Sequence, residues 1–551
     1  MVERVSHRHS TKLDPMNQIP SSNRRTALVL IALASLLLAA AIVFGDARVR
    51  GLVRNTSFLV AAVIAISVPL GTSIAFLLAR FQLPGRKLLT LGWGAAVFIP
   101  IYLQAAAWEA GFGSQGWYSL QKQEFHRPLL DGWYGAIWIH AMAAIPWVTL
   151  IMFVTFRYPA KRLEDAASLD ASGTQVFFHI TLRRSLPGLA LAGLWVGIIT
   201  ATEITVTDMK QIRTFAEEAF MSLVLGEDPL DLAAMTLLTG TLVGLTLSAL
   251  AIAASNLSPR HLDPSQPPAF LDRKLSGWRW PLTILQLSTF SFFVLFPIGN
   301  LIYKASRVVV VEDGVKRSFW SITSFCQQYF GAIWEFRAEF FWSTAIGLVT
   351  AVTTVLLATL LVVLASNRQR AVALAFILGI CLATPGPIIG HLTVLLLNCR
   401  YLPPLVFLYD NTIAAPVLAL TVRALPFATL VLWFAATSVS QATIHSALLD
   451  GCTRWQLWWR IIVPQRRWFW LLAIFVAFTT SWNEVGSLSN MVVPPGINLV
   501  SKEIFDLIHF GVEDRLAGLC LMTLTYYVVL LGLLFGSWRI SHVGNAGRRS
   551  A

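Results

Sequence analysis

The sequence predicts an all-helical integral membrane protein with about twelve transmembrane spans. Of its 551 residues, 56% are apolar and only 13% are charged. Apolar runs of about 18 or more residues recur along the whole chain, and each is long enough to cross a hydrocarbon layer about 30 Å thick. The runs lack the strict alternation of a transmembrane β-barrel, so the spans are predicted to be helices.

The apolar runs fall into two sets of six. We expect spans near residues 26–44, 57–79, 89–108, 132–155, 187–203 and 232–255, and again near 281–304, 341–365, 372–397, 413–437, 467–483 and 516–538. The predicted organisation is a basic tail, a first six-helix repeat, a linker, a second six-helix repeat and a final tail, at 1–25, 26–255, 256–280, 281–540 and 541–551. The first run also resembles a signal peptide, but the even number of spans favours an uncleaved helix.

The positive charge indicates how the chain lies in the membrane. The formal net charge of +13 would also suit nucleic-acid binding, but most of the basic residues lie in alternate segments between spans. Examples are Arg80 with Arg86 and Lys87, and Arg460 with Arg466. Because lysine and arginine are enriched in cytoplasmic segments, this pattern places both termini in the cytoplasm. The charge is therefore a topology signal, and we expect no nucleic-acid partner.

The two sets of spans repeat each other in detail. Pro146 and Pro426 are 280 residues apart, as are Asp170 and Asp450. An even number of spans in each repeat gives both halves the same orientation, so the sequence predicts a pseudo-two-fold axis along the membrane normal.

Two water-facing segments at equivalent places share a helix–turn–helix pattern. The first contains Asp165-Ala166-Ala167 and then Asp170-Ala171, and the second contains His445-Ser446-Ala447 and then Asp450-Gly451. Each is followed by a second amphipathic segment, which ends near Ile180 in one half and at Ile461-Ile462-Val463-Pro464 in the other. A small residue at each turn permits a sharp bend close to another backbone.

These segments resemble the EAA loop of ABC-transporter permeases, with departures at Ala171, Arg183 and His445. The resemblance implies that a cytoplasmic ATP-binding subunit dimer docks on the loops. The positions assigned to this coupling are Asp165, Ala167, Asp170, Ala171, Ile180, His445, Asp450, Gly451, Ile461 and Pro464.

Two such halves in one polypeptide resemble the ferric-iron permeases of binding-protein-dependent importers, and permeases for thiamine and polyamines are similar in form. The resemblance implies a type I ABC importer permease in the bacterial inner membrane, surrounded by lipid. It also implies that a periplasmic or extracellular solute-binding protein delivers the solute, with ferric iron as the expected substrate.

The chain has no GxxxxGK[ST] phosphate-binding motif. We therefore expect no cofactor, and we expect ATP hydrolysis on a separate chain. The five cysteines show no metal-ligand spacing, so no metal site is predicted.

Three ionisable residues at membrane depth are candidates for the translocation path, because such residues are costly in lipid. Glu203 and Glu484 end equivalent spans, and they either line the route or simply mark the helix ends. Arg423 lies deeper in its span, where it would bond to carbonyls or pair with a carboxylate.

Pro146 and Pro426 each remove a helical hydrogen bond, so they are candidate hinges or fixed kinks. Residues 215–226 and 499–511 are expected to form short amphipathic helices outside the membrane, which either cap the outer mouth and receive the binding protein or simply lie at the membrane interface.

Two other functional classes share some of these features. A secondary transporter can also have two parallel six-span halves, but it needs coupling carboxylates in the spans and no docking loops. A membrane enzyme needs a cluster of catalytic carboxylates or histidines at one surface, and the sequence shows none.

Overall fold

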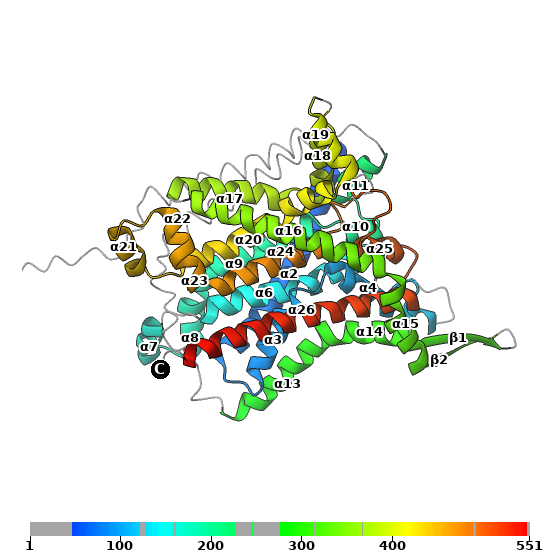
Figure 1. Ribbon diagram of the computed structural model, residues 1–551. Helices are drawn as coiled ribbons and strands as arrows, with labels where there is room; N and C mark the ends of the chain where they lie inside the picture. Colours follow the sequence, from blue (N-terminus) through cyan, green and yellow to red (C-terminus); the bar gives the residue numbers. More distant parts are fainter. Residues whose placement is uncertain are drawn as a thin grey trace, which may run out of the picture.

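The computed structural model is a bundle of long, nearly parallel helices (Figure 1). It describes residues 47–121, 128–157, 161–225, 245, 276–312, 315–365, 367–399, 401–488 and 492–547. The described residues contain seven helices long and apolar enough to cross a membrane, or up to ten if each of three bent helix pairs is one span. The predicted spans near 26–44 and 232–255 lie outside the described residues, apart from Leu245, and the total of twelve stays a prediction.

The first half contains a compact set of transmembrane helices. Its elements are α2 (Ala47–Arg80), α3 (Arg86–Ala96), α4 (Ile101–Phe112), α5 (Trp117–Gln121), α6 (Gly132–Arg157), α7 (Lys161–Asp170), α8 (Gly173–Val176), the π-helical turn η1 (Phe177–Leu182), α9 (Arg183–Ala201), α10 (Thr205–Met209) and α11 (Phe215–Leu225).

The second half has a similar order of elements and begins with the span α13–α14, whose predicted counterpart at 26–44 lies outside the described residues. Its elements are η3 (Ser276–Trp278), α13 (Arg279–Phe290), η4 (Ser291–Leu295), α14 (Phe296–Ala305), β1 (Arg307–Glu312), β2 (Val315–Trp320), α15 (Ile322–Glu335), α16 (Arg337–Leu364), α17 (Arg368–Ala383), α18 (Gly386–Leu397), α19 (Pro403–Asn411), α20 (Ala414–Thr437), α21 (Gln441–Leu449), α22 (Arg454–Leu457), η5 (Trp458–Ile462), α23 (Val463–Gln465), α24 (Arg467–Asn483), α25 (Val500–Ile508) and α26 (Asp514–Gly547).

The strands β1 and β2 correct the expectation of an all-helical chain. They form an antiparallel hairpin in which Val309 pairs with Ser318, and it projects from one end of the bundle (Figure 1). The sequence carried a signal for it, because Asp313-Gly314 separates a valine run from a second β-prone run.

Two predicted spans are sharply bent at prolines. The predicted span at 89–108 is the pair α3 and α4, bent by 100°, and the span at 372–397 is the pair α17 and α18, bent by 104°. Pro100 and Pro385 sit at the breaks with extended backbone (ψ 149° and 144°) and begin the second helix of each pair. Proline lacks the amide hydrogen and locks φ, so it suits the start of a helix better than its interior.

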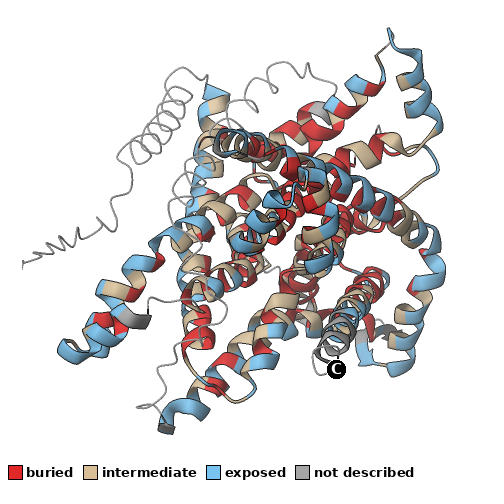
Figure 2. Cartoon of the chain, turned by 60° about the vertical axis from the view of Figure 1, so that its left-hand side comes forward, coloured by how far each residue is buried: buried red, intermediate tan, exposed pale blue. Residues whose placement is uncertain are grey.

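Helices pack in the same pattern in both halves. In the first, α2, α6 and α9 pack on one another, and in the second, α16, α20 and α24 do the same. The halves also exchange contacts, because α11 packs on α18 while α25 packs on α4. Buried residues gather where the helices meet, and exposed residues lie toward the outside (Figure 2). This reciprocal packing fits the predicted pseudo-two-fold arrangement.

Close approach of α2 and α6 depends on a glycine. A β-carbon placed at Gly71 would lie 2.7 Å from the Val148 Cβ atom, whereas one at Gly193 on α9 would meet nothing within 4 Å. Small residues at helix interfaces give close packing in lipid.

We expect Gly71→Ala to lower the free energy of unfolding by about 1–3 kcal/mol, because the added methyl overpacks this interface. Gly193→Ala is the matched control and should be neutral or slightly stabilising, because alanine is the better helix former. Thermal unfolding of both variants in detergent measures the difference. Equal unfolding temperatures would contradict this account of the interface.

Candidate functional site: paired loops and a central cavity

The two loop segments lie at the same end of the bundle. Helices α7 and α8 of the first half, and α21 and α22 of the second, lie at the left of Figure 1, which we call the loop end. Helices α10, α11 and α25 lie at the opposite end. Among the positions predicted to contact an ATPase, Asp165, Asp170, His445, Asp450, Gly451 and Pro464 are exposed, and Ala167, Ala171, Ile180 and Ile461 are partly buried.

The turn of each loop is built by short-range hydrogen bonds. Gly451 takes the left-handed conformation (φ 78°), and the next amide, of Cys452, donates to the Ala447 carbonyl at 3.0 Å. This is the usual way for a helix to end at glycine. In the first half the Ala171 amide donates to the Ala167 carbonyl at 2.9 Å. Gly451 therefore meets a conformational need, whereas Ala171 closes its turn without a positive φ.

Each second loop helix begins with a capping box, which the sequence analysis missed. In the first half the Ser172 amide donates to Gln175 Oε1 at 3.0 Å, and the Gln175 amide donates back to Ser172 Oγ. In the second half Thr453 and Gln456 make the same pair of bonds, at 2.8 and 3.3 Å. The signal was visible as Ser-x-x-Gln and Thr-x-x-Gln. These bonds fix where each helix starts.

Large apolar side chains are exposed at equivalent places on the two loops. Leu169 and Leu449 are 85% and 88% exposed, and Phe178 and Trp459 are 62% and 52% exposed. The latter two lie in the π-helical turns η1 and η5. π-Helical turns are frequent at functional sites. An exposed apolar group repeated in both halves is typical of a protein-binding surface.

A buried ion pair anchors the first loop to the bundle. The Arg80 guanidinium at the end of α2 pairs with the Glu164 carboxylate on α7, and Thr181 Oγ1 in η1 donates to Glu164 at 2.7 Å. The Arg80 and Glu164 side chains are only 3% and 10% exposed. In the second half Ile444 occupies the position equivalent to Glu164. Asp165, which the sequence analysis assigned to ATPase coupling, is exposed, and its neighbour Glu164 makes this buried contact.

A cavity of about 170 Å³ lies between the halves. The first half contributes an apolar and aromatic wall, which includes Trp147, Trp195 and Ile198. The second half contributes a polar wall, which includes Thr479, Thr480, Asn483, Glu484 and Arg423, together with the aromatic Phe427.

Arg423 and Glu484 form an ion pair at this cavity. Arg423 Nε donates to Glu484 Oε2 at 2.8 Å, and Arg423 Nη1 donates to the Thr384 carbonyl at 3.2 Å. Glu484 Oε1 accepts the Ser487 amide at 3.1 Å. Arg423 thus makes both kinds of bond that the sequence suggested, and Glu484 stabilises the loop that follows its helix.

Glu203 has the equivalent position but different partners. Its carboxylate accepts the Thr205 and Val206 amides at 2.6 and 3.0 Å, which begins α10. His140 Nε2 lies 3.2 Å from Glu203 Oε2, and His140 Nδ1 bonds to the Ala136 carbonyl at 2.8 Å. Glu203 does not line the cavity, so the two carboxylates do not face each other across it. His140 is buried.

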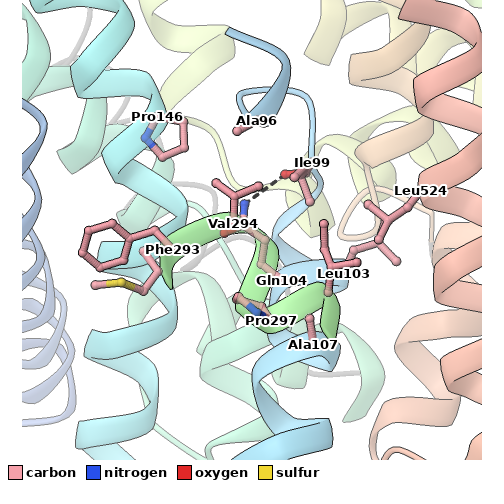
Figure 3. Close-up of a pocket in the computed structure, with 12 residues that line it drawn as sticks. Ala96, Ile99, Leu103, Gln104, Ala107, Pro146, Phe293, Val294, Pro297 and Leu524 are labelled. Carbon is pink, nitrogen blue, oxygen red and sulfur yellow. Dashed lines mark hydrogen bonds between the residues drawn. The ribbon is translucent and has the colours of Figure 1, made fainter. Parts of the chain in front are cut away.

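The candidate hinge prolines lie inside continuous helices. Pro146 is buried in α6 and Pro426 is buried in α20. Pro146 also borders a small cavity of about 20 Å³ (Figure 3), where Gln104 Nε2 donates to the Ile99 carbonyl at 3.1 Å. That volume holds about one water molecule.

Within the described part of the chain, no three His, Cys, Asp or Glu side chains gather as a metal site would require.

The helical bundle and its apolar spans define a multi-pass membrane protein, and the paired loops give it the features of a transporter permease. The chain is 25% identical over 184 residues to the diacetylchitobiose uptake system permease protein NgcG of Streptomyces coelicolor, covering 32% of this chain and 57% of the relative. It is 34% identical over 141 residues to the molybdenum transport system permease protein ModB of Haemophilus influenzae, covering 24% of this chain and 58% of the relative.

These relatives are ABC permeases, which supports the same class for this chain. The chain spans less than three-fifths of the length of each relative. No family model matches the chain, and no solved structure matches it.

We expect Glu164→Ala to lower the free energy of unfolding by about 3–5 kcal/mol, because it leaves the Arg80 charge buried without its partner. The exposed neighbour Asp165→Asn is the control and should change stability by less than about 0.5 kcal/mol. The double variant Arg80→Met/Glu164→Met should recover most of the loss, because apolar replacement of a buried ion pair is often neutral. Thermal unfolding in detergent measures all three variants. If Glu164→Ala were as stable as Asp165→Asn, the anchoring role of the ion pair would be contradicted.

Proposed function

We propose that this chain is the permease subunit of an ATP-driven importer. The observation that carries the proposal is the duplicated loop, which presents equivalent exposed apolar side chains at one end of the bundle. A cytoplasmic ATP-binding subunit dimer would dock one subunit on each loop. The protein then lies in a bacterial inner membrane with its loop end and both termini in the cytoplasm, and it hydrolyses no ATP itself.

The loops are suited to transmit movement from such a partner. The capping boxes hold the turns, and the helices after them lead directly into the spans α9 and α24. A secondary transporter of two parallel halves would have no use for these docking features.

The opposite end is the proposed site for the solute-binding protein. Helices α11 and α25 lie where the sequence predicted short helices at the outer mouth. Their reciprocal packing on α18 and α4 connects this surface to the bent spans of both halves.

We expect Leu169→Asp and Leu449→Asp to abolish co-purification of the ATPase subunits and ATP-dependent uptake when combined. Each side chain is almost fully exposed, so a charge there disrupts an apolar interface while leaving the unfolding temperature within about 2 °C of wild type. Thr174→Asp, at a nearby exposed polar position, is the control. Unchanged uptake by the double variant would favour the secondary-transporter alternative.

The central cavity is the proposed route for the solute. Arg423 and Glu484 neutralise each other, so their ion pair gives the cavity little net attraction for a free ion. The aromatic wall and the hydroxyl-rich wall together suit a solute that has both apolar and polar surface.

Ferric iron stays the substrate predicted from the family resemblance, with thiamine and polyamines as alternatives. The composition of the cavity supports iron only as a complex whose organic shell contacts the tryptophans. The names of the two relatives add an amino-sugar disaccharide and molybdenum to the solutes that need testing.

We expect Trp195→Ala to raise the KM of uptake up to about tenfold for the solute that the importer carries, because stacking against one aromatic ring contributes about 0.5–1.5 kcal/mol. The carried solute is the one accumulated in a panel of ferric iron, molybdate, diacetylchitobiose, thiamine and spermidine. Trp280→Ala is the control, because Trp280 lies on α13 and is 67% exposed. If both variants have wild-type KM, the cavity is not the route.

A further inference from the structure

One ion pair joins the two halves at the end opposite the loops. His509 follows α25 of the second half, and Asp208 lies in α10 of the first half. His509 Nε2 lies 3.0 Å from Asp208 Oδ2, with the side chains 35% and 19% exposed. Movement of α25 away from α10 must separate these atoms.

The hydrogen-bond geometry determines the charge of His509. Its other ring nitrogen, Nδ1, lies 2.7 Å from the Phe505 carbonyl oxygen. A carbonyl and a carboxylate oxygen can only accept, so each ring nitrogen must carry a proton to make both bonds. The arrangement therefore selects the imidazolium form, and the link is a charge-assisted hydrogen bond.

The pair is not a by-product of the internal repeat. The positions equivalent to His509 and Asp208 in the opposite halves are Val224 and Ser489, and neither can be charged. The link is therefore present once and on one side of the pseudo-two-fold axis.

The pair is part of a larger contact between the halves. Gln115 Nε2 donates to the Phe510 carbonyl at 3.0 Å, and the Phe220 and Phe505 rings meet edge to face with centroids 6.1 Å apart. Gly511 has φ 96°, and a β-carbon there would lie 2.5 Å from the Gln115 side chain. These contacts hold the end of α25 and the residues after it against the first half.

Other charged groups near the pair have partners of their own. Asp506, the other acid near His509, lies 3.4 Å from Lys502 on the same helix. On the other side of Asp208, burial raises the pKa of Glu217 to about 7, with added repulsion from Glu218 and Asp208. Glu218 pairs with Arg48, and the charge of Arg213 opposes the rise at Glu217. On the packed helix α4, Glu109 is held by Lys210 at 2.6 Å.

We propose that His509 and Asp208 form a proton-sensitive latch that closes the outer mouth of the translocation path. The latch must break each time the path opens to the outside, and its role in transport rests on the proposed importer function. Because it faces the extracytoplasmic solution, its strength follows the pH of that compartment.

The direction of the pH effect follows from linkage. The hydrogen bond that His509 donates to Asp208 raises the pKa of His509 above its ordinary value in the closed form, while burial opposes the rise. The latch is therefore fully present below the ordinary histidine pKa and is lost as pH rises through the raised value.

The test measures the width of the outer mouth in the full-length chain in lipid nanodiscs. Spin labels are placed by Leu225→Cys on α11 and Phe510→Cys after α25, in a background without the native cysteines. Distances are recorded by pulsed electron resonance from about pH 5 to about pH 9, the range in which a histidine titrates. We expect the closed-to-open ratio to fall about tenfold as pH rises, because a hydrogen bond to a charged group contributes about one decade.

His509→Gln and Asp208→Asn should remove most of this change and hold the mouth as open at low pH as wild type is at high pH. Asp506→Asn is the matched control, since it removes a carboxylate from the same helix without breaking the link, and it should behave as wild type. Glu217→Gln should keep the histidine step. The latch would be overturned if the wild-type distance did not change with pH. It would also be overturned if Asp506→Asn altered the pH dependence of the distance as much as His509→Gln does.

The measurement needs no ATPase, so its outcome is separate from that of the proposed function. If the wild-type distance does not depend on pH but ATP-driven uptake is normal, the latch is rejected and the importer function is not. Absence of ATP-driven uptake together with a pH-dependent distance rejects the importer alone.

Discussion

Irregular backbone at membrane depth needs hydrogen-bond partners, and this requirement shapes the centre of the protein. Lipid offers none, so a broken helix survives only where side chains satisfy its free amides. Glu203 does this by accepting the Thr205 and Val206 amides, and Glu484 accepts the Ser487 amide. Each carboxylate then needs a positive or hydrogen-bonding neighbour. The acids that sequence reasoning assigned to the route are therefore first of all the supports of two broken helices.

The two halves meet this common requirement with different chemistry. Glu484 pairs with Arg423 beside the central cavity, whereas Glu203 lies near His140 and outside it. The loop end shows the same divergence, because the Glu164 anchor of the first half is replaced by Ile444 in the second. The two halves share a packing pattern, but their buried polar positions differ. A functional assignment made for one half cannot simply be transferred to the other.

Sequence patterns predicted the spans and loops because these depend on composition and local spacing. Ten of the expected spans coincide with helices or bent pairs in the described residues, and both loops have the expected turn. The partners of charged residues were harder to predict, because they depend on which helices meet. Glu164 and Asp165 are adjacent in sequence, yet only the packing of α2 against α7 decides which one is buried. The hairpin and the capping boxes were local signals that were missed.

In the first half one continuous helical run leads from the loop toward the latch. Residues Gly173–Ala201 form a single run of 29 helical residues, which is about 44 Å at the usual rise per residue. Glu203 then ties its far end to α10, which carries Asp208. In the second half the corresponding helices are bent by 86° between Gln465 and Arg467. We expect a displacement at the first loop to be transmitted along this continuous run toward the latch, whereas the second half is interrupted at its bend. The anchor meets the run at Thr181, and the latch follows its far end, so we expect the first half to dominate coupling between the loop end and the outer mouth.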